Sequence, residues 1–453
     1  MANISKSNVP QFSVDIYQNE FLPEGGREVN AIVTVTSTGG GTTGGLPLAT
    51  HGPADVPGSG AGSAAGAAVV IMVDCSGSMD YPPTKMRSAR EATAAAIDTI
   101  RDGVAFAVVA GTHVAKEVYP GNGGVAVAGP ATRHQAKEAL RRLSSGGGTA
   151  IGTWLRLADR LLSTAEVSIR HGILLTDGRN EHEKPEQLRA ALESCAGRFT
   201  CDARGVGTDW EVKELTGIAS ALLGTVDIVA DPSGLEADFR RMMETAMGKE
   251  VADVALRVWT PQGAEIQYVK QVAPTVEDLT ARRTEAGPRA GDYPTGSWGD
   301  ESRDYHVNVV VPAAGVGQEM LAARISLVLP QPDGTSRVLG QGLVRALWTD
   351  DMAASTRINP QVAHYTGQAE LAQVIQQGLE ARKQGDLDSA TAKLGRAVQL
   401  ASASGNDDTA KLLAKVVDVV DAATGTVRLK ARVADADEMT LETRSTKTVR
   451  VKK

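Results

Sequence analysis

The sequence predicts an α/β domain that is inserted into a β-sandwich and followed by a helical domain. Between residues 67 and 248, short apolar segments alternate with segments of helical periodicity, which is typical of a mostly parallel sheet with helices on both faces. Residues 251–350 contain only strand-like segments, and residues 12–37 contain two more. Helical patterns return at 359–423. The chain has 453 residues, which is enough for two or three domains of ordinary size.

The α/β domain begins with the segment 68–73, an unbroken apolar run of the kind found in strands that are buried on both faces of a parallel sheet. A helix is expected next, at 84–101, because apolar residues recur there at helical spacing. The same alternation continues to the end of the domain. The other predicted strands are 104–110, 114–119, 169–176, 199–206 and 225–230, and the other predicted helices are 132–143, 150–163, 185–196, 210–222 and 234–246.

The β-sandwich is predicted from strands on both sides of the α/β domain. Five strands after the domain would be an odd, incomplete set, whereas two further strands before it make enough for two packed sheets. We therefore expect residues 12–37 to pair with residues 251–349. The predicted strands are 12–21 and 29–36, then 254–259, 264–272, 305–311, 322–329 and 339–347.

The remaining segments are a linker, a helical domain and a tail. Residues 38–66 predict a flexible linker, because they are rich in glycine with scattered serine, proline and alanine. The helical domain, 359–423, is expected to hold helices at 363–384, 387–403 and 407–422, and the turn around Gly385 resembles a single tetratricopeptide hairpin. Residues 424–453 are expected to form a C-terminal tail that is loose or adds an edge strand.

The composition excludes several classes of protein. Acidic residues outnumber basic ones by 54 to 47, and the resulting net charge of −7 argues against nonspecific binding of nucleic acid. Three cysteines provide no disulfide framework and are typical of a reducing compartment. The longest apolar run, 64–73, is too short to span a bilayer, and residues 1–11 lack the apolar core of a signal peptide. We therefore expect a cytoplasmic protein without a membrane span; the sequence does not indicate its oligomeric state.

Oxygen-bearing side chains follow three elements of the predicted α/β domain. Asp74, Ser76 and Ser78 come directly after the first strand, Thr149 ends a loop of three glycines before a helix, and Asp177 follows the strand 169–176. In open α/β sheets, ligands bind at the carboxyl ends of the strands. Carboxylate and hydroxyl oxygens are hard donors that suit Mg²⁺, Mn²⁺ or Ca²⁺. The sequence therefore predicts a divalent metal site at this edge.

The pattern Asp-x-Ser-x-Ser, then Thr, then Thr-Asp-Gly resembles the metal-ion-dependent adhesion site (MIDAS) of von Willebrand factor A (vWA) domains. Asp74, Ser76, Ser78, Thr149 and Asp177 occupy all five expected positions, in the expected order and on the expected elements. The resemblance covers residues 67–248 and implies a Rossmann-like vWA domain of the bacterial cytoplasmic type. It also implies that the three hydroxyls bind the ion directly, while the two aspartates act at least partly through water.

The resemblance implies a function as well as a fold. A cation held mostly by neutral oxygens stays electrophilic, and in the family an open coordination position captures an Asp or Glu carboxylate of a partner protein. We therefore expect a metal-dependent protein-interaction module or scaffold without enzymatic activity, with Mg²⁺, or else Mn²⁺ or Ca²⁺, as its cofactor.

Residues close to the predicted ligands are interpreted more conservatively. Glu181, His182 and Glu183 follow Asp177 and are expected to form an ordinary solvated loop, with a ring around the mouth of the site as the alternative. Cys75 lies between two ligand positions and is expected to be a small buried side chain rather than a reactive thiol.

Two other functions remain open at this stage. A metal-assisted phosphohydrolase is possible in principle, because two aspartates and a cation could activate water. The sequence contains no Asp-x-Asp phosphatase loop, Gly-x-Ser-x-Gly elbow or P-loop, which argues against it. Within the binding class, some cytoplasmic relatives of this domain work beside AAA-type ATPases in metal-centre assembly, and others work with phospho-signalling proteins of bacteria.

Overall fold

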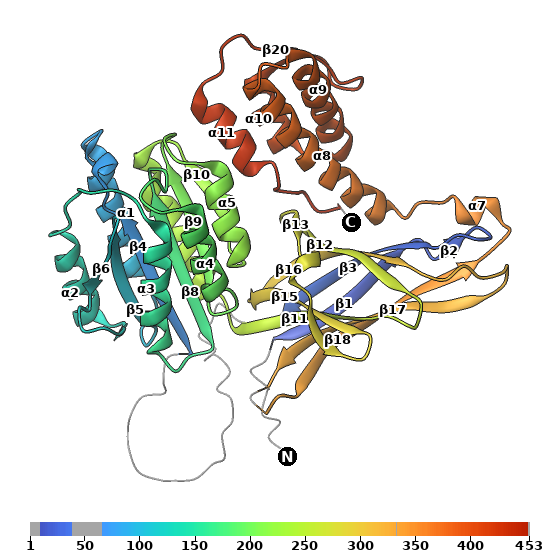
Figure 1. The fold of residues 1–453 in the computed structure, drawn as a ribbon, viewed down its shortest axis with the longest axis horizontal. Coiled ribbons are helices and arrows are strands. Elements are labelled where there is room, and N and C mark those ends of the chain that lie inside the picture. The colour runs from blue at the N-terminus through green and yellow to red at the C-terminus, as the bar shows by residue number, and fades with distance from the viewer. Residues whose placement is uncertain (1–9, 39–65, 332, 452–453) are drawn as a thin grey trace, which may run out of the picture. The chain divides into compact units, whose positions relative to one another are not determined.

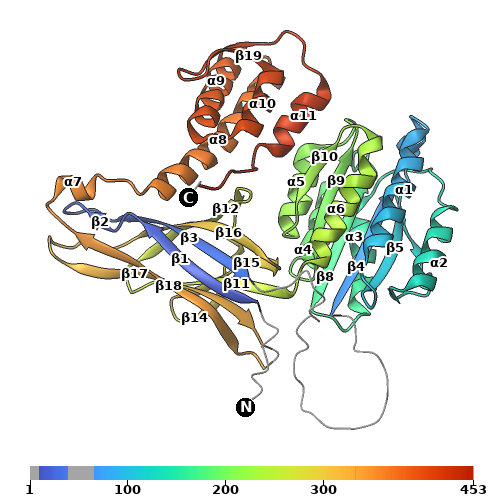
Figure 2. The same cartoon turned by 180° about the vertical axis from the view of Figure 1, so that it is seen from behind.

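A computed structural model describes residues 10–38, 66–331 and 333–451 of the chain (Figures 1 and 2). The predicted linker at 38–66 lies almost entirely outside these residues. The structure divides into two compact units. The first is the described part of Gly40–Ala252 together with Ser297–Gly299, and the second is the described part of Gln11–Gly39, Asp253–Gly296 and Asp300–Lys453.

The first unit is built on a mostly parallel sheet whose centre is β4 (Ala67–Asp74). Every residue of β4 is buried, as its unbroken apolar run predicts. It pairs in parallel with β5 (Ala105–Gly111) on one side and with β8 (Ile169–Thr176) on the other. The sheet continues in parallel beyond β8 and in antiparallel fashion beyond β5; these outer strands are β9 (Thr200–Val206), β10 (Val226–Val229), β6 (Ala115–Tyr119) and β7 (Ala126–Val127).

Helices cover both faces of this sheet (Figures 1 and 2). On one face, Val69, Ile71 and Val73 of β4 join a single apolar core with α1 (Thr84–Thr99), α2 (Pro130–Leu140) and α6 (Leu235–Met247). The opposite face is covered by α3 (Ile151–Ser163), α4 (Pro185–Cys195) and α5 (Val212–Ala221). The predicted α/β fold class is therefore confirmed, and its strands direct their carboxyl ends to one edge.

Two large β-sheets form the first part of the second unit. The first has the strand order β1-β3-β16-β12-β13, and the second has the order β14-β15-β11-β17-β18-β2. The side chains of Val14 and Ile16 on β1 lie so close to Gly340 and Gly342 of β18 that no Cβ would fit on these glycines, so the sheets pack face to face. The strands are β1 (Gln11–Gln18), β2 (Phe21–Leu22), β3 (Glu28–Thr38), β11 (Val251–Trp259), β12 (Glu265–Ala273), β13 (Glu277–Asp278), β14 (Thr284–Gly287), β15 (Ala290–Trp298), β16 (Glu301–Val310), β17 (Glu319–Pro330) and β18 (Ser336–Trp348).

Strands from before and after the α/β domain share both sheets of this unit. β3 pairs antiparallel with β16 along its whole length, and β2 pairs in parallel with β18. The α/β domain is thus inserted between them in the sequence. The expectation of seven strands was too low, because β13, β14 and the glycine- and proline-bearing β15 lack an apolar alternation. The predicted strand 12–21 is also two strands, β1 and β2.

Helices form the C-terminal part of the second unit. α8 and α9 pack as an antiparallel hairpin joined at Gly385, whose φ of 80° places it in the left-handed region. The predicted helix 407–422 was partly wrong: α10 ends at Val416, and the β-branched residues that follow form the strand β19. The helices and strands are α7 (Met352–Ser355), α8 (Pro360–Lys383), α9 (Leu387–Ser404), α10 (Asp407–Val416), β19 (Val417–Asp421), β20 (Thr426–Leu429) and α11 (Asp435–Arg444).

The segment after residue 424, expected to be a loose tail or an edge strand, contains β20 and α11 and ends on the β-sheet. Arg450 donates through Nε and Nη2 to the carboxylate of Asp304, at 2.8 and 2.9 Å. The Tyr365 hydroxyl of α8 donates to the same carboxylate at 2.6 Å. Asp304 is only 1% exposed, so these contacts join the tail, α8 and β16 around a buried charge. Within the described residues, none of the helices has the length and apolar character needed to cross a membrane.

Candidate metal centre

Three loops meet where β4 and β8 end. The backbone N–H of Gly77 donates to the Gly147 carbonyl at 2.9 Å, and that of Gly146 donates to the Cys75 carbonyl at 2.8 Å. These bonds join the loop after β4 to the glycine loop that carries Thr149. Gly147 has a φ of 80° and no space for a Cβ beside His113, so this close approach requires glycine.

The predicted ligands Ser76, Ser78 and Asp177 are in direct contact with one another. The Ser76 and Ser78 hydroxyl oxygens are 2.9 Å apart, and the Ser78 hydroxyl donates to Asp177 Oδ1 at 2.6 Å. Adjacent ligands of an octahedral Mg²⁺ ion, each 2.0 to 2.1 Å from the metal, lie about 3 Å apart. The spacing of the two serine oxygens therefore fits such an ion.

The Thr149 hydroxyl lies beside the same small space. A Cβ built on Gly178 would lie 3.3 Å from the Ser78 hydroxyl oxygen and 3.8 Å from the Thr149 hydroxyl oxygen. Both hydroxyls thus face one point beside Gly178, although they are far apart in the sequence. Thr149 is 4% exposed, whereas Ser78 is exposed, so the cluster opens to solvent on the serine side.

Asp74 lies beneath these hydroxyls and is completely buried. Its Oδ1 accepts the backbone N–H of Ser76 at 2.8 Å, and its Oδ2 accepts the hydroxyl of Thr176 at 2.6 Å. Burial raises the pKa of the Asp74 carboxyl to about 6, against the lowering effect of these hydrogen bonds; the nearby Asp177 raises it further. Asp74 therefore orients the serine loop from below, and a bound cation would favour its ionised form.

Asp177 is held between the serine loop and a lysine. While its Oδ1 accepts from Ser78, its Oδ2 accepts from Lys85 Nζ at 2.6 Å. Lys85, in the first turn of α1, is 5% exposed, and its second carboxylate neighbour is the exposed Asp209 at 3.7 Å. Lys85 therefore compensates the buried charge of Asp177, whose side chain is fully buried.

The loop after Asp177 holds the first turn of α3 in place. The amide of Asn180 accepts the Ile151 N–H at 2.7 Å, His182 Nδ1 accepts the Thr149 N–H at 3.3 Å, and Glu183 Oε2 accepts the Gly152 N–H at 2.8 Å. These side chains satisfy backbone donors that a helix leaves unpaired at its start. The loop thus links Asp177 to Thr149.

The expectation of an ordinary solvated loop at 181–183 was only partly right. Glu181 and His182 are exposed, but the Glu183 side chain is 3% exposed and faces the start of α3. Cys75 is 1% exposed, and burial raises the pKa of its thiol to about 12, as expected for an inert side chain.

The structure therefore brings all five predicted residues to one edge of the sheet, and the spacing of the two serine oxygens and the oxygen-rich donor set suit a small, hard cation. Among the described residues, no three His, Cys, Asp or Glu side chains converge as a metal cluster. The candidate site is no exception, because three of its five side chains are hydroxyls. Sequence reasoning missed the roles of Lys85, Thr176 and Asn180. Only Thr176, beside Asp177, gave a local signal.

Comparison with known proteins agrees with this geometry. Residues 67–228 match the von Willebrand factor type A domain, and residues 399–445 match the von Willebrand factor type A C-terminal domain. A solved structure described as von Willebrand factor type A from Catenulispora acidiphila is 52% identical over 100% of this chain and 99% of its own length, with a TM-score of 0.89. The chain belongs to the von Willebrand factor type A family.

Comparison with more distant solved structures gives information on the fold alone. The ArnB paralog VWA2 from Sulfolobus acidocaldarius is 15% identical, with a TM-score of 0.59 over 95% of this chain and 97% of its own, which shows a shared fold. A structure of proximal thread matrix protein 1 from the mussel byssus is described as having a zinc-occupied MIDAS motif. It is 26% identical over 40% of this chain and 46% of its own, and its TM-score of 0.34 is too low to carry an argument here. None of the curated proteins matches the sequence.

Proposed function

We propose that this vWA protein is a metal-dependent protein-interaction module of the bacterial cytoplasmic type. Ser76, Ser78 and Thr149, supported by Asp74 and Asp177, would hold one divalent cation, with Mg²⁺ the first candidate and Mn²⁺ or Ca²⁺ the others. The observation that carries the proposal is the convergence of three hydroxyls from two loops above two buried carboxylates. The bound ion would supply an electrophilic position for an Asp or Glu carboxylate of a partner protein.

The charges around the site favour an acidic partner. Among the buried groups, Asp74 and Asp177, when ionised, contribute two negative charges and Lys85 contributes one positive charge, which leaves a sum of −1; the exposed Asp209 beside Lys85 is screened by water. A divalent cation changes this sum to +1. Since the surroundings are largely buried, one excess positive charge attracts a carboxylate more strongly than it would in water.

The hydrogen bonds of the two aspartates favour binding over catalysis. Asp74 accepts from Ser76 and Thr176 with its two oxygens, and Asp177 accepts from Ser78 and Lys85 with its two. A general base must reach the proton that it removes with an available oxygen. Each of the four oxygens already accepts one hydrogen bond, and both carboxylates are fully buried, so neither offers an exposed oxygen to a substrate proton. We therefore propose a binding role without hydrolytic activity.

The cysteines support a reducing compartment. Cys75, Cys195 and Cys201 are all unpaired and buried. Unpaired thiols are typical of proteins that stay in the cytoplasm, which is where we propose that this protein works.

The experiment is a capture of partner proteins from the native lysate on the immobilised full chain, with Mg²⁺ or with EDTA. Ser78→Ala removes one exposed hydroxyl of the site, and Ser194→Ala, an exposed serine of α4, is the matched control. We expect EDTA and Ser78→Ala to abolish capture of the same proteins, while Ser194→Ala retains it. Capture that survives both EDTA and Ser78→Ala would overturn the proposal.

A further inference from the structure

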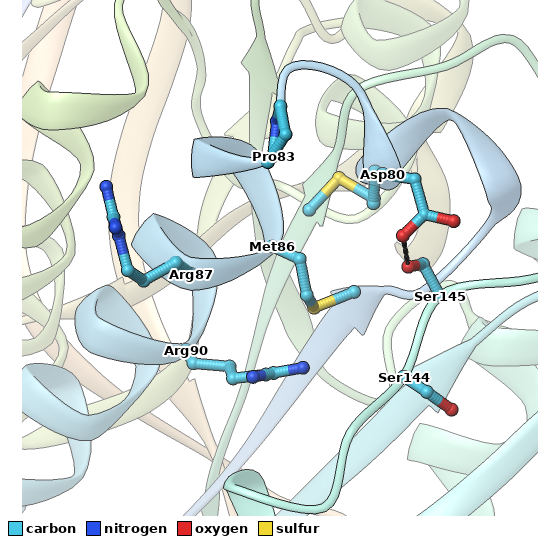
Figure 3. A pocket seen from close by; sticks show the side chains of 8 residues that line it. Asp80, Pro83, Met86, Arg87, Arg90, Ser144 and Ser145 are labelled. Atoms are coloured by element: carbon cyan, nitrogen blue, oxygen red, sulfur yellow. Dashed lines mark hydrogen bonds between the residues drawn. The ribbon is translucent and has the colours of Figure 1, made fainter.

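A pocket of about 330 Å³ lies beside the candidate metal centre (Figure 3). Its walls come from the turn Gly77–Asp80, from α1 and from the loop between α2 and α3. Met79 and Met86 provide thioether groups, Arg87 and Arg90 provide guanidinium groups, and Asp80 and Ser145 form a hydrogen-bonded pair. Figure 3 shows that pair on one side of the pocket, Arg87 on the other, and Arg90 reaching across toward Ser144.

The pocket and the metal centre share the same two loops. Met79 directly follows the predicted ligand Ser78, and neighbouring Cα atoms are about 4 Å apart. Ser145 lies four residues before Thr149, and the backbone bond from Gly146 to Cys75 fixes its loop against the serine loop. The pocket therefore lies within reach of the residues that flank a carboxylate placed at the metal centre.

The charges of the pocket suit an anion. In the described part of the chain, neither Arg87 nor Arg90 has a carboxylate within 4.0 Å, and Arg90 Nε is buried without a hydrogen-bond partner. The other end of Arg90 donates to the Leu143 carbonyl, which fixes the direction of the side chain. The Asp80 carboxylate already accepts a hydrogen bond from Ser145, so the pocket lining carries two guanidinium groups and a single, hydrogen-bonded carboxylate. Arginine in such a setting recognises carboxylates through paired hydrogen bonds.

The apolar part of the pocket suits a side chain with a methylene stem. Met79 is 0% and Met86 is 6% exposed, so thioethers form the inner wall, and methionine adapts its shape to what it contacts. At the rim, Tyr81 is 81% exposed and is followed by the exposed prolines 82 and 83. Exposed tyrosine is a common anchor in protein interfaces.

We propose that this pocket receives a glutamate side chain from the same partner segment whose carboxylate reaches the metal centre. The stem of the glutamate contacts Met79 and Met86, and its carboxylate pairs with Arg87 and Arg90. Tyr81 packs against the backbone of the segment. The inference rests on the proposed function and narrows it. The partner segment carries two acidic residues a few positions apart, of which one reaches the metal centre and the other binds Arg87 and Arg90.

The test uses the full chain, Mg²⁺ and synthetic glycine–serine peptides. One peptide has a single central Asp, a series adds one Glu at each position on either side, and a further series has phosphoserine instead of that Glu. We expect the best Glu peptide to bind about fivefold more tightly than the single-Asp peptide, as for a partly exposed charge pair. Arg87→Glu reverses one exposed charge without removing the contact of Arg90 with Leu143, and it should abolish this gain. The matched control is Arg160→Glu, on an exposed arginine of α3 on the opposite face of the sheet.

Each outcome separates the two proposals. If the single-Asp peptide binds only with Mg²⁺ but no added Glu improves binding, the pocket proposal is wrong and the metal proposal stands. If the Glu peptide still binds more tightly than the single-Asp peptide in Arg87→Glu, or if this difference is lost equally in Arg160→Glu, the pocket does not bind the second carboxylate. A gain with phosphoserine alone contradicts the glutamate assignment. If the single-Asp peptide does not bind with Mg²⁺, the proposed function itself fails.

Discussion

Replacing Thr176 by valine tests how the metal centre keeps a charge buried. The Thr176 hydroxyl donates to Asp74 Oδ2 at 2.6 Å, and both side chains are completely buried. Valine has nearly the same shape but no hydroxyl, so the substitution opens no cavity, leaves one carboxylate oxygen unsatisfied and also removes the acceptor of the Gly178 N–H at 3.3 Å, a loss that does not depend on pH. An unsatisfied buried group of this kind costs about 1 to 3 kcal/mol, and more when it is charged.

The cost of Thr176→Val should depend on pH, because the pKa of Asp74 is about 6 instead of its ordinary value near 3.8. Between these values the folded protein holds a proton that the unfolded chain has lost, so stability without metal falls as the pH rises through this window, by about 3 kcal/mol at most. Near pH 5 Asp74 is mostly protonated, and the substitution should cost only about 1 kcal/mol. At neutral pH Asp74 is charged, and the cost should be about 1 to 2 kcal/mol larger.

Urea denaturation of the full chain in EDTA, at both pH values, measures this difference. Thr99→Val is the matched control, since its hydroxyl donates only to a helix carbonyl, that of Ala95, at 2.9 Å. That variant should change stability by less than about 0.5 kcal/mol at either pH. An equal cost of Thr176→Val at both pH values would refute the reasoning, because it would mean that the hydroxyl does not support the charged form of Asp74.

Three further predictions concern Lys85, Gly178 and Asp304. Lys85→Met should destabilise the metal-free protein by about 3 kcal/mol, because it leaves the Asp177 carboxylate without a positive partner. It should also enlarge the increase in melting temperature on adding Mg²⁺. An increase equal to that of the wild type would contradict the pairing of Lys85 with Asp177. Gly178→Ala should weaken Mg²⁺ binding about tenfold in calorimetry, because the added Cβ lies close to the Ser78 and Thr149 hydroxyls. Gly217→Ala, with nothing near its Cβ, should bind Mg²⁺ as the wild type does. Equal affinities of the two variants would show that a Cβ at position 178 does not disturb these hydroxyls. Asp304→Asn should lower the free energy of unfolding by about 2 kcal/mol and expose the C-terminal tail to protease; an intact tail would show that the buried charge does not hold it.

The sequence predicted the five proposed ligands because each carries its own local signal. Asp74 and Asp177 stand where apolar runs end, and Thr149 follows three glycines. Of their supporting residues, Thr176 carries a local signal because it precedes Asp177, whereas Lys85 and Asn180 carry none. Lys85 looks like any lysine in the first turn of a helix, and only the packing of α1 against one face of the sheet places its ammonium group beside Asp177.

The fold shows the same division between local pattern and tertiary context. The strands of the α/β domain were predictable because burial on both faces makes them continuously apolar. In contrast, β15 contains Gly291, Pro294 and Gly296 and owes its extended form to neighbours on both sides. Val417 and its neighbours continue the apolar pattern of α10, yet they form a strand because they pair with β20.

The central claim, that five side chains hold one divalent cation, is tested most directly by calorimetric titration of Mg²⁺ and Mn²⁺ into the EDTA-treated full chain. We expect one ion per chain for the wild type and none at this site for a Ser76→Ala, Ser78→Ala double variant that still melts cooperatively. Equal binding by the wild type and that variant, or no binding by the wild type, would contradict it.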